Sequence, residues 1–194
     1  MTVTAGMDFM QRFVVIFDSL KPESDRGCVL VVSAMVENAI ANHISQRLVP
    51  PATSDDELIG RSMNCPISSF SAKINLAYRI GIITLEERGI YHQLRELRNR
   101  CAHDIEKQDF AANHFKTRTR NIIEKSPALW ETIKSKVAPR LYPGAELSSV
   151  EAFVDKIGWR VAFAMFFALI VGHKEAFADR VVRLSPLGVP AAST

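Results

Sequence analysis

Residues 94–103, with the sequence LRELRNRCAH, combine side chains that bind phosphate with one that can move a proton. The basic and amide side chains within nine positions are Arg95, Arg98, Asn99, Arg100 and His103. A guanidinium matches phosphate oxygens through two parallel hydrogen bonds, and an imidazole titrates near neutral pH. Such a cluster is costly to bury unless it has partners. These residues are therefore the candidate functional site.

Helical spacing decides which members of the cluster can act together. Residues four apart share a face, so Arg95, Asn99 and His103 should form one polar row. Arg98 and His103 are five residues apart, about 140° around an ideal helix. The two side chains meet only if the helix frays at its end, or if a second chain brings its own copy alongside.

The segment that carries the cluster has the strongest helical pattern in the chain. Thr84 followed three residues later by Glu87 is a capping-box signature. Apolar residues then recur at spacings of four, three, four and four, at Ile90, Leu94, Leu97, Cys101 and Ile105. The pattern predicts an amphipathic helix with the polar cluster near its C-terminal end.

The other segments also predict helices, and no stretch alternates apolar and polar residues as a strand would. The expected helices cover residues 8–20, 24–48, 70–81, 110–124, 127–136 and 148–183, with a short one at 57–62 and turns at Pro139 and 142–144. We predict an all-α, single-domain bundle of about six or seven helices over residues 1–184. Residues 185–194 read as a flexible tail.

Composition points to a soluble chain with ample core material, 47% hydrophobic and 23% charged. Three widely spaced cysteines favour neither disulfides nor zinc and fit a reducing cytoplasm. The first residues lack a signal-peptide pattern, and the apolar run 161–172 is shorter than the about 20 residues of a membrane span. No metal-ligand or nucleotide-binding motif occurs, so we expect no metal, no cofactor, no membrane association and a cytoplasmic location.

A basic segment follows the candidate site. Residues 113–140 contain seven lysines and arginines against two glutamates, in a chain of net charge +3. Lys116, Arg118 and Arg120, together with Arg95, are candidate nucleic-acid contacts. The alternative is an ordinary solvated helix face, since aromatic residues for base stacking are few in this segment.

Two family resemblances rest on these residues. The pattern Arg98-Asn99-x-x-x-His103 resembles the signature of the HEPN superfamily. A wider likeness, over residues 24–125, is to the bacterial mannitol operon repressor family. It is carried by residues 26–48, Ser69-Phe70-Ser71-Ala72-Lys73-Ile74, Ala77-Tyr78, Gly81-Ile82-Ile83 and the arginine–histidine segment. The first twenty residues and everything after Pro127 lie outside it.

The HEPN resemblance implies an all-α, usually dimeric fold and a metal-independent endoribonuclease site. Arg98 would bind the scissile phosphate, His103 would take the proton from a ribose 2′-hydroxyl, and Asn99 would orient the histidine or the sugar. The repressor resemblance implies instead a regulator that acts through a protein partner or RNA, since no helix-turn-helix is evident. The regulator is preferred because its resemblance covers more of the chain.

Two further interpretations concern partners. Arg98 and Arg100 could simply pair with carboxylates of this or neighbouring helices, and His103 could cap carbonyls of the last turn. The run 161–172 is apolar on almost every face, more than one chain would be expected to cover, and this predicts a homodimer.

Overall fold

The computed structural model describes residues 6–54, 56–60, 65–103 and 109–186. Within them the chain is all-α, as predicted, and its only β feature is an isolated bridge between Ile59 and Ile67. The α-helices are α1 Phe9–Leu20, α2 Asp25–Arg47, α3 Phe70–Arg79, α4 Leu85–His103, α5 Asn113–Glu124, α6 Pro127–Thr132, α7 Ala138–Leu141, α8 Val150–Ile157 and α9 Trp159–Ala176. A π-helical turn, Ile133–Val137, joins α6 to α7, and a 3₁₀ turn, Ala178–Arg180, follows α9.

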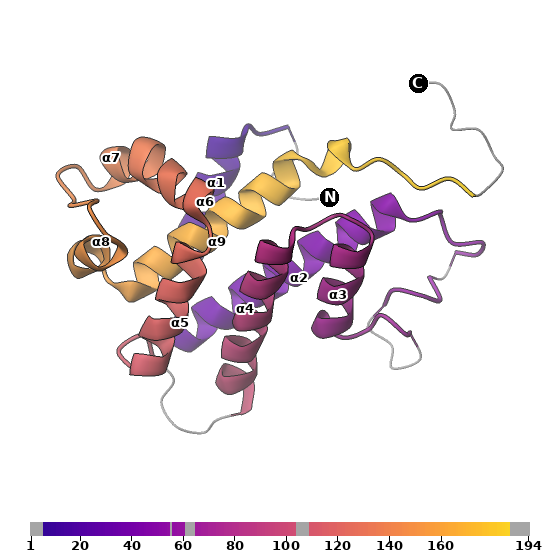
Figure 1. Cartoon of the computed structure of the whole chain (residues 1–194), viewed down its shortest axis with the longest axis horizontal. Helices are drawn as coiled ribbons and strands as arrows, with labels where there is room; N and C mark the ends of the chain where they lie inside the picture. The colour runs from indigo at the N-terminus through magenta and orange to yellow at the C-terminus, as the bar shows by residue number, and fades with distance from the viewer. Residues whose placement is uncertain (1–5, 55, 61–64, 104–108, 187–194) are drawn as a thin grey trace.

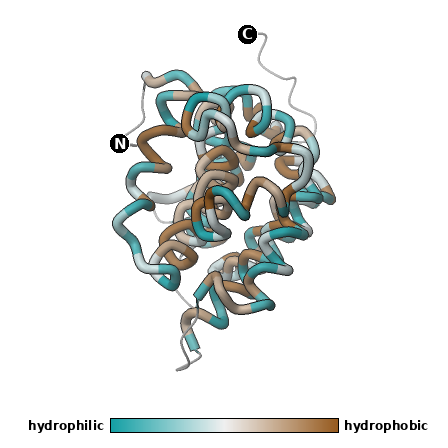
Figure 2. Tube along the Cα trace, turned by 90° about the vertical axis from the view of Figure 1, so that its left-hand side faces the viewer, coloured by the Kyte–Doolittle hydropathy of each residue, from teal (hydrophilic) through white to brown (hydrophobic). Residues whose placement is uncertain are grey.

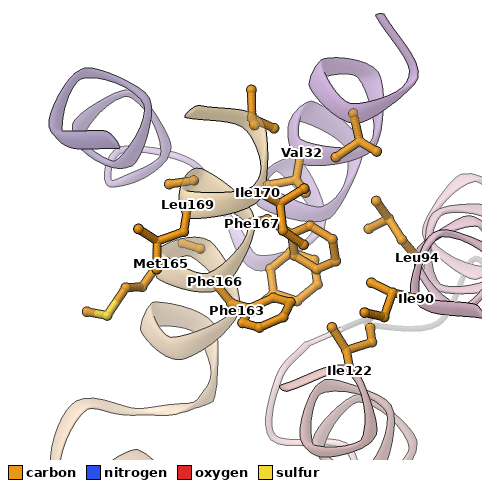
Figure 3. Packing of buried hydrophobic residues seen from close by; sticks show 14 of the residues in the cluster. Val32, Ile90, Leu94, Ile122, Phe163, Met165, Phe166, Phe167, Leu169 and Ile170 are labelled. Atoms are coloured by element: carbon orange, nitrogen blue, oxygen red, sulfur yellow. The ribbon is translucent and has the colours of Figure 1, made fainter. Parts of the chain in front are cut away.

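Helix α9 is the centre of the bundle (Figure 1), with α1, α2, α5, α6 and α8 packed around it. Phe163 and Phe167 face Val32 of α2 and the side chains of α4 and α5, as Figure 3 shows. Hydrophobic positions lie mainly toward the interior in Figure 2, with hydrophilic ones more frequent outside. Every residue from 162 to 172 is buried within the single chain. The other helices cover this run, so its burial gives no reason to expect a second chain, and the homodimer stays a prediction.

Helix starts follow the local sequence signals closely. Asp8 and Gln11 form a reciprocal capping box at α1, while the side chains of Ser24 and Ser69 accept from backbone N–H groups at the starts of α2 and α3. Gly81 ends the α3 region with a φ of +74°, a conformation that glycine adopts without steric cost. The capping and the apolar spacing together account for the predicted extents of these three helices.

Arg160 joins the start of α9 to the connection between α1 and α2. Its Nη2 donates to the carbonyl oxygens of Leu20, Lys21 and Glu23, at 3.3, 2.7 and 2.8 Å. Its Nε lies 3.4 Å from a carboxylate oxygen of Asp25. Carbonyls at a helix end have no partner within the helix, and this arginine satisfies them while fixing the contact of α1 with α9.

The predicted last helix, 148–183, is in fact two helices. Gly158 has a φ of +84°; its N–H donates to Val154 O of α8 and its carbonyl accepts from Ala162 N of α9. One residue thus terminates α8 and begins α9 in a backbone conformation that other residues rarely adopt. The apolar pattern runs through both helices, so periodicity alone did not locate the break.

Two smaller predictions also fail. Residues 57–60 are not helical: the Asp56 carboxylate accepts from the N–H groups of Leu58 and Ile59 and forms a local turn instead. The remaining residues of that predicted helix, 61 and 62, lie outside the described part of the chain. Pro139 does not form a turn but lies in the first turn of α7, where its missing N–H costs no hydrogen bond.

One described helix, α2, is long and apolar enough to cross a membrane by length and composition. Half of its most apolar stretch is buried, and the helix packs against α3, α4 and α9. Core helices of soluble proteins share this composition, so the feature is a weak indication of a membrane location.

Candidate nucleic-acid interface

The rotation of α4 is fixed at its first turn. Thr84 N–H donates to Glu87 Oε2 at 2.9 Å, and Glu87 N–H donates to Thr84 Oγ1 at 3.1 Å, so the predicted capping box is formed. Glu87 Oε1 also lies 2.6 Å from Lys174 Nζ of α9 and accepts from the Tyr91 hydroxyl at 3.3 Å. Burial raises the pKa of Tyr91 well above its ordinary value. This one carboxylate therefore caps α4 and joins it to the central helix.

The apolar side of α4 is completely enclosed. Its residues with no exposed surface are Ile90, Tyr91, Leu94, Leu97 and Cys101. Each fully buried aliphatic side chain contributes roughly 1.5–3 kcal/mol relative to an exposed one. With one side of the helix held this firmly, the polar residues on the other sides have a defined direction.

Five polar residues form a row along α4, which we call the α4 row: Arg88, His92, Arg95, Asn99 and His103. The first four are half-buried and His103 is exposed. Spacing predicted the last three. It missed Arg88 and His92, which continue the same row toward the start of the helix and could have been found by extending the spacing backward. Fifteen residues of helix give the row a length of about 22 Å.

Asn75 of α3 anchors the first half of the row. Its Oδ1 accepts from Arg88 Nε and Nη2, at 3.1 and 3.0 Å, and lies 3.3 Å from His92 Nε2. An amide oxygen accepts only, so Nε2 of His92 carries the proton. The Arg88 guanidinium also stands 5.7 Å from the centre of the half-exposed Tyr78 ring. Helix α3 thus orients the Arg88 side chain without neutralising its charge.

The positive charge of the α4 row and of the neighbouring Arg98 is not balanced locally. Among the described residues, no carboxylate forms an ion pair with Arg88, Arg95 or Arg98. Arg95 Nε and His92 Nδ1 are buried atoms that lack a hydrogen-bond partner there. Burial lowers the pKa of His92, and the charges of Arg88 and Arg95 lower it further. The row therefore combines uncompensated charge with one unsatisfied donor and one unsatisfied acceptor.

The predicted catalytic residues are not gathered into one site within this chain. Arg98 is exposed and its Nη1 donates to Asn99 Oδ1 at 3.2 Å. Helix α4 continues regularly to His103, so the helix does not fray before that residue and the about 140° offset between Arg98 and His103 applies. Of the two routes that would bring them together, only a second chain remains within the described part of the protein.

The basic residues of α5 have a different environment from those of α4. Arg118 forms an ion pair with Glu96 of α4, and Arg120 forms one with Glu151 of α8. The Arg120 guanidinium also stands 5.5 Å from the centre of the Trp159 ring. Lys116 is half-buried and forms no ion pair with any described residue. Two of the three predicted phosphate contacts on α5 are therefore already paired within the fold.

Lys73, within the segment that resembles the repressor family, has a role inside the fold. Its side chain is 6% exposed, and its Nζ lies 2.6 Å from Glu37 Oε1 and donates to Ser68 O at 3.1 Å. A buried ammonium requires such partners. Lys73 therefore ties α3 to α2 and holds the helix that carries Asn75.

Other chemistry finds little support. No group of three His, Cys, Asp or Glu side chains is arranged to hold a metal ion in the parts of the chain that the structure covers. None of the three cysteines, all of which lie in the described part of the chain, forms a disulfide; Cys28 and Cys101 are buried and Cys65 is half-buried. Burial raises the pKa of Cys28 to about 12, so its thiol is protonated at neutral pH and is not an activated nucleophile.

Comparison of the chain with protein-family models, curated proteins and solved structures found no match. The resemblances to the HEPN superfamily and the mannitol operon repressor family therefore remain predictions from the residues that carry them. The functional conclusion depends on the geometry and charge of α4 and its neighbours.

Proposed function

We propose that this protein is a regulator that binds single-stranded RNA along the α4 row and the neighbouring Arg98. The regulatory role rests on the resemblance to the mannitol operon repressor family, and the RNA on the row itself. The observation that carries the proposal is that the guanidinium groups of Arg88, Arg95 and Arg98 have no carboxylate partner among the described residues. Phosphate oxygens would supply the missing negative charge.

Single-stranded RNA suits this surface better than duplex DNA. The half-exposed Tyr78 ring beside Arg88 offers a face on which an unpaired base can stack. A DNA-reading helix contacts bases with its N-terminal residues, whereas α4 begins with Leu85 and the exposed Glu86, which would repel phosphates.

Fluorescence anisotropy with RNA and DNA of the same sequence tests this assignment. We expect tighter binding of single-stranded RNA than of duplex DNA. If the three guanidiniums each neutralise one phosphate, the logarithm of affinity should fall with the logarithm of salt with a slope of about −2. Arg95→Ala should reduce that slope by about 0.7. Equal binding of both nucleic acids, or a slope near zero, would contradict the proposal.

A second candidate, a metal-independent endoribonuclease, is favoured by one observation. Arg98 and His103 are both exposed, on different sides of the same helix end, so two chains related by a twofold axis would be able to form sites from Arg98 of one copy and His103 of the other. Each phosphate would be bound by an arginine, and the histidine would act as general base on the 2′-hydroxyl.

Mixing two inactive variants tests the shared site. Arg98→Ala and His103→Ala should each abolish the formation of cyclic-phosphate ends, in the presence of EDTA. Their mixture should regain roughly one quarter of wild-type activity, because half of the random dimers are mixed and each mixed dimer has one complete site. No recovery on mixing, or a monomer by light scattering at micromolar concentration, would reject the nuclease and leave RNA binding untouched.

A further inference from the structure

A cavity of about 390 Å³ lies at the end of the bundle where α4 begins, away from His103. The C-terminal ends of α2 and α9, the turn between α3 and α4, and residues 181–182 form its walls. Small-molecule sites commonly have volumes of about 300–1,000 Å³. This cavity falls within that range and uses none of the residues of the α4 row.

The walls of the cavity carry more positive than negative charge. Arg47, Lys174 and Arg180 contribute to the lining, and Glu87 pairs with only one of them, Lys174. Neither Arg47 nor Arg180 forms an ion pair with a described residue. The cavity thus has an excess of two positive charges, which would favour an anion inside it.

Arg47 and Arg180 are held in place without being neutralised. Arg47 Nε donates to Ile80 O at 3.3 Å and its Nη1 donates to Val182 O. The Arg180 guanidinium stands 4.2 Å from the centre of the Phe177 ring. Carbonyls and an aromatic face carry no net charge, so both cations keep theirs. Lys174 lies in the last turn of α9, and Arg180 ends the 3₁₀ turn that follows that helix.

The remaining walls are neutral. Nε2 of His43 lies 2.9 Å from Lys174 O and therefore carries the proton, since a carbonyl only accepts. Burial lowers the pKa of both His43 and His173, so these imidazoles are uncharged at neutral pH. The ring of Phe177 and the aliphatic side chain of Ile82, in the turn, add apolar surface.

We propose that this cavity binds a small organic anion, with its acidic group at Arg180 and Arg47 and its apolar body against Phe177 and Ile82. The acidic group can be a carboxylate or a phosphate, because a guanidinium accepts both in the same geometry. Such a ligand is the kind of signal to which a regulator responds. The inference does not depend on RNA binding, since the cavity and the α4 row share no residue.

Phenyl phosphate and benzoate serve as the probes, and benzyl alcohol as the neutral control of similar shape. Imidazole signals of the five histidines, followed by nuclear magnetic resonance, report where each compound binds. Both anions should shift the signals of His43 and His173 saturably, at millimolar concentration or below, while those of His92, His103 and His114 stay in place. Benzyl alcohol should cause no saturable shift.

Arginine variants test whether the positive charge of the cavity lining contributes to binding of the anions. Arg180→Ala should weaken binding of the anions by about tenfold or more, as expected for the loss of a charge-assisted contact. Arg183→Ala removes the same charge from an exposed residue three positions further on that does not line the cavity, and it should retain wild-type affinity. Thermal melts of both variants establish that they are folded.

Three results would overturn the proposal. The first is the absence of a saturable shift with either anion at about 10 mM, well above the affinity range of a specific small-ligand site. The second is equal binding of benzyl alcohol, which would make the cavity an apolar site. The third is an equal loss of affinity in Arg180→Ala and Arg183→Ala, which would show only a general effect of surface charge.

Discussion

Helices α4 and α5 both carry several arginines, yet the charges of these arginines are available to very different degrees. On α5, Arg118 and Arg120 each form an ion pair, with Glu96 and Glu151. On α4, Arg88, Arg95 and Arg98 form none with the described residues. The number of basic residues in a segment therefore says less about binding than the position of the carboxylates around it. The α5 segment is the more basic in sequence, and α4 is the better phosphate surface in three dimensions.

The largest expected effect concerns the buried side of α4. Leu94→Ala should lower the free energy of unfolding by about 2–5 kcal/mol, because it leaves a cavity beside α9 and α2. Arg118→Ala on α5 should cost well under 1 kcal/mol, since it removes only a partly exposed ion pair. Urea melts measure both values. Comparable losses would mean that the assignment of the buried face is wrong.

Two glutamates of α4, Glu87 and Glu96, should show the next largest difference, in their contributions to stability. Glu87→Gln removes the ion pair with Lys174, whose side chain is 11% exposed, and weakens the cap at Thr84. We expect a loss of about 1–3 kcal/mol, since the ammonium is left in a largely buried position. Glu96→Gln, on the outward side, should cost less than about 1 kcal/mol. If thermal melts rank the two variants in the opposite order, Glu87 does not anchor α4.

A smaller effect should appear in the pH dependence of folding stability, through His43 of α2 and its neighbour Lys174 of α9. Burial, and next the charge of Lys174, lower the folded-state pKa of His43, while Glu87 and His173 also face this group. The unfolded state therefore binds a proton more readily, so this contribution to stability is present above about pH 6.5 and is lost as pH falls below it. His43→Gln should flatten the decline of the melting temperature between neutral and mildly acidic pH. An unchanged decline would show that other groups cause it.

The smallest expected effect is the coupling free energy between the ion-paired side chains of α4 and α5. A double-mutant cycle of Arg118→Ala and Glu96→Gln should give about 0.2–1 kcal/mol, decreasing as salt is added. The same cycle with Arg95 in place of Arg118 should give no measurable coupling, because Arg95 forms no ion pair with Glu96. A coupling between Arg95 and Glu96 as large as the first would remove the distinction between the two helices.

Local signals in the sequence predicted much of the fold. The capping box at Thr84 marked the start of α4, and the apolar spacing of that helix identified its buried side. In the structure, the side chains of Asp8, Ser24 and Ser69 cap the three earlier helices in a similar way. These signals act over three or four residues and do not depend on the rest of the chain. The break at Gly158 was missed because the apolar pattern runs through both helices, although a glycine with positive φ is a common helix end.

The site was predictable only in part. Periodicity placed Arg95, Asn99 and His103 on one row, and would have added Arg88 and His92 if extended backward. It gave no information on pairing, because Glu151 is more than thirty residues from Arg120 and meets it only through the arrangement of α5 and α8. Whether an arginine is free depends on such distant carboxylates.

Nucleic-acid binding by two matched double variants tests the central claim most directly. One double variant combines Arg88→Ala with Arg95→Ala and removes two positive charges from α4. The other combines Arg118→Ala with Arg120→Ala and removes two positive charges from the neighbouring helix α5. We predict that the α4 pair weakens binding of single-stranded RNA by about tenfold to a hundredfold, while the α5 pair weakens it less than about threefold. Circular dichroism melts verify that both variants fold. Equal losses, or a larger loss from the α5 pair, would contradict the account, because free and paired arginines would then bind RNA alike.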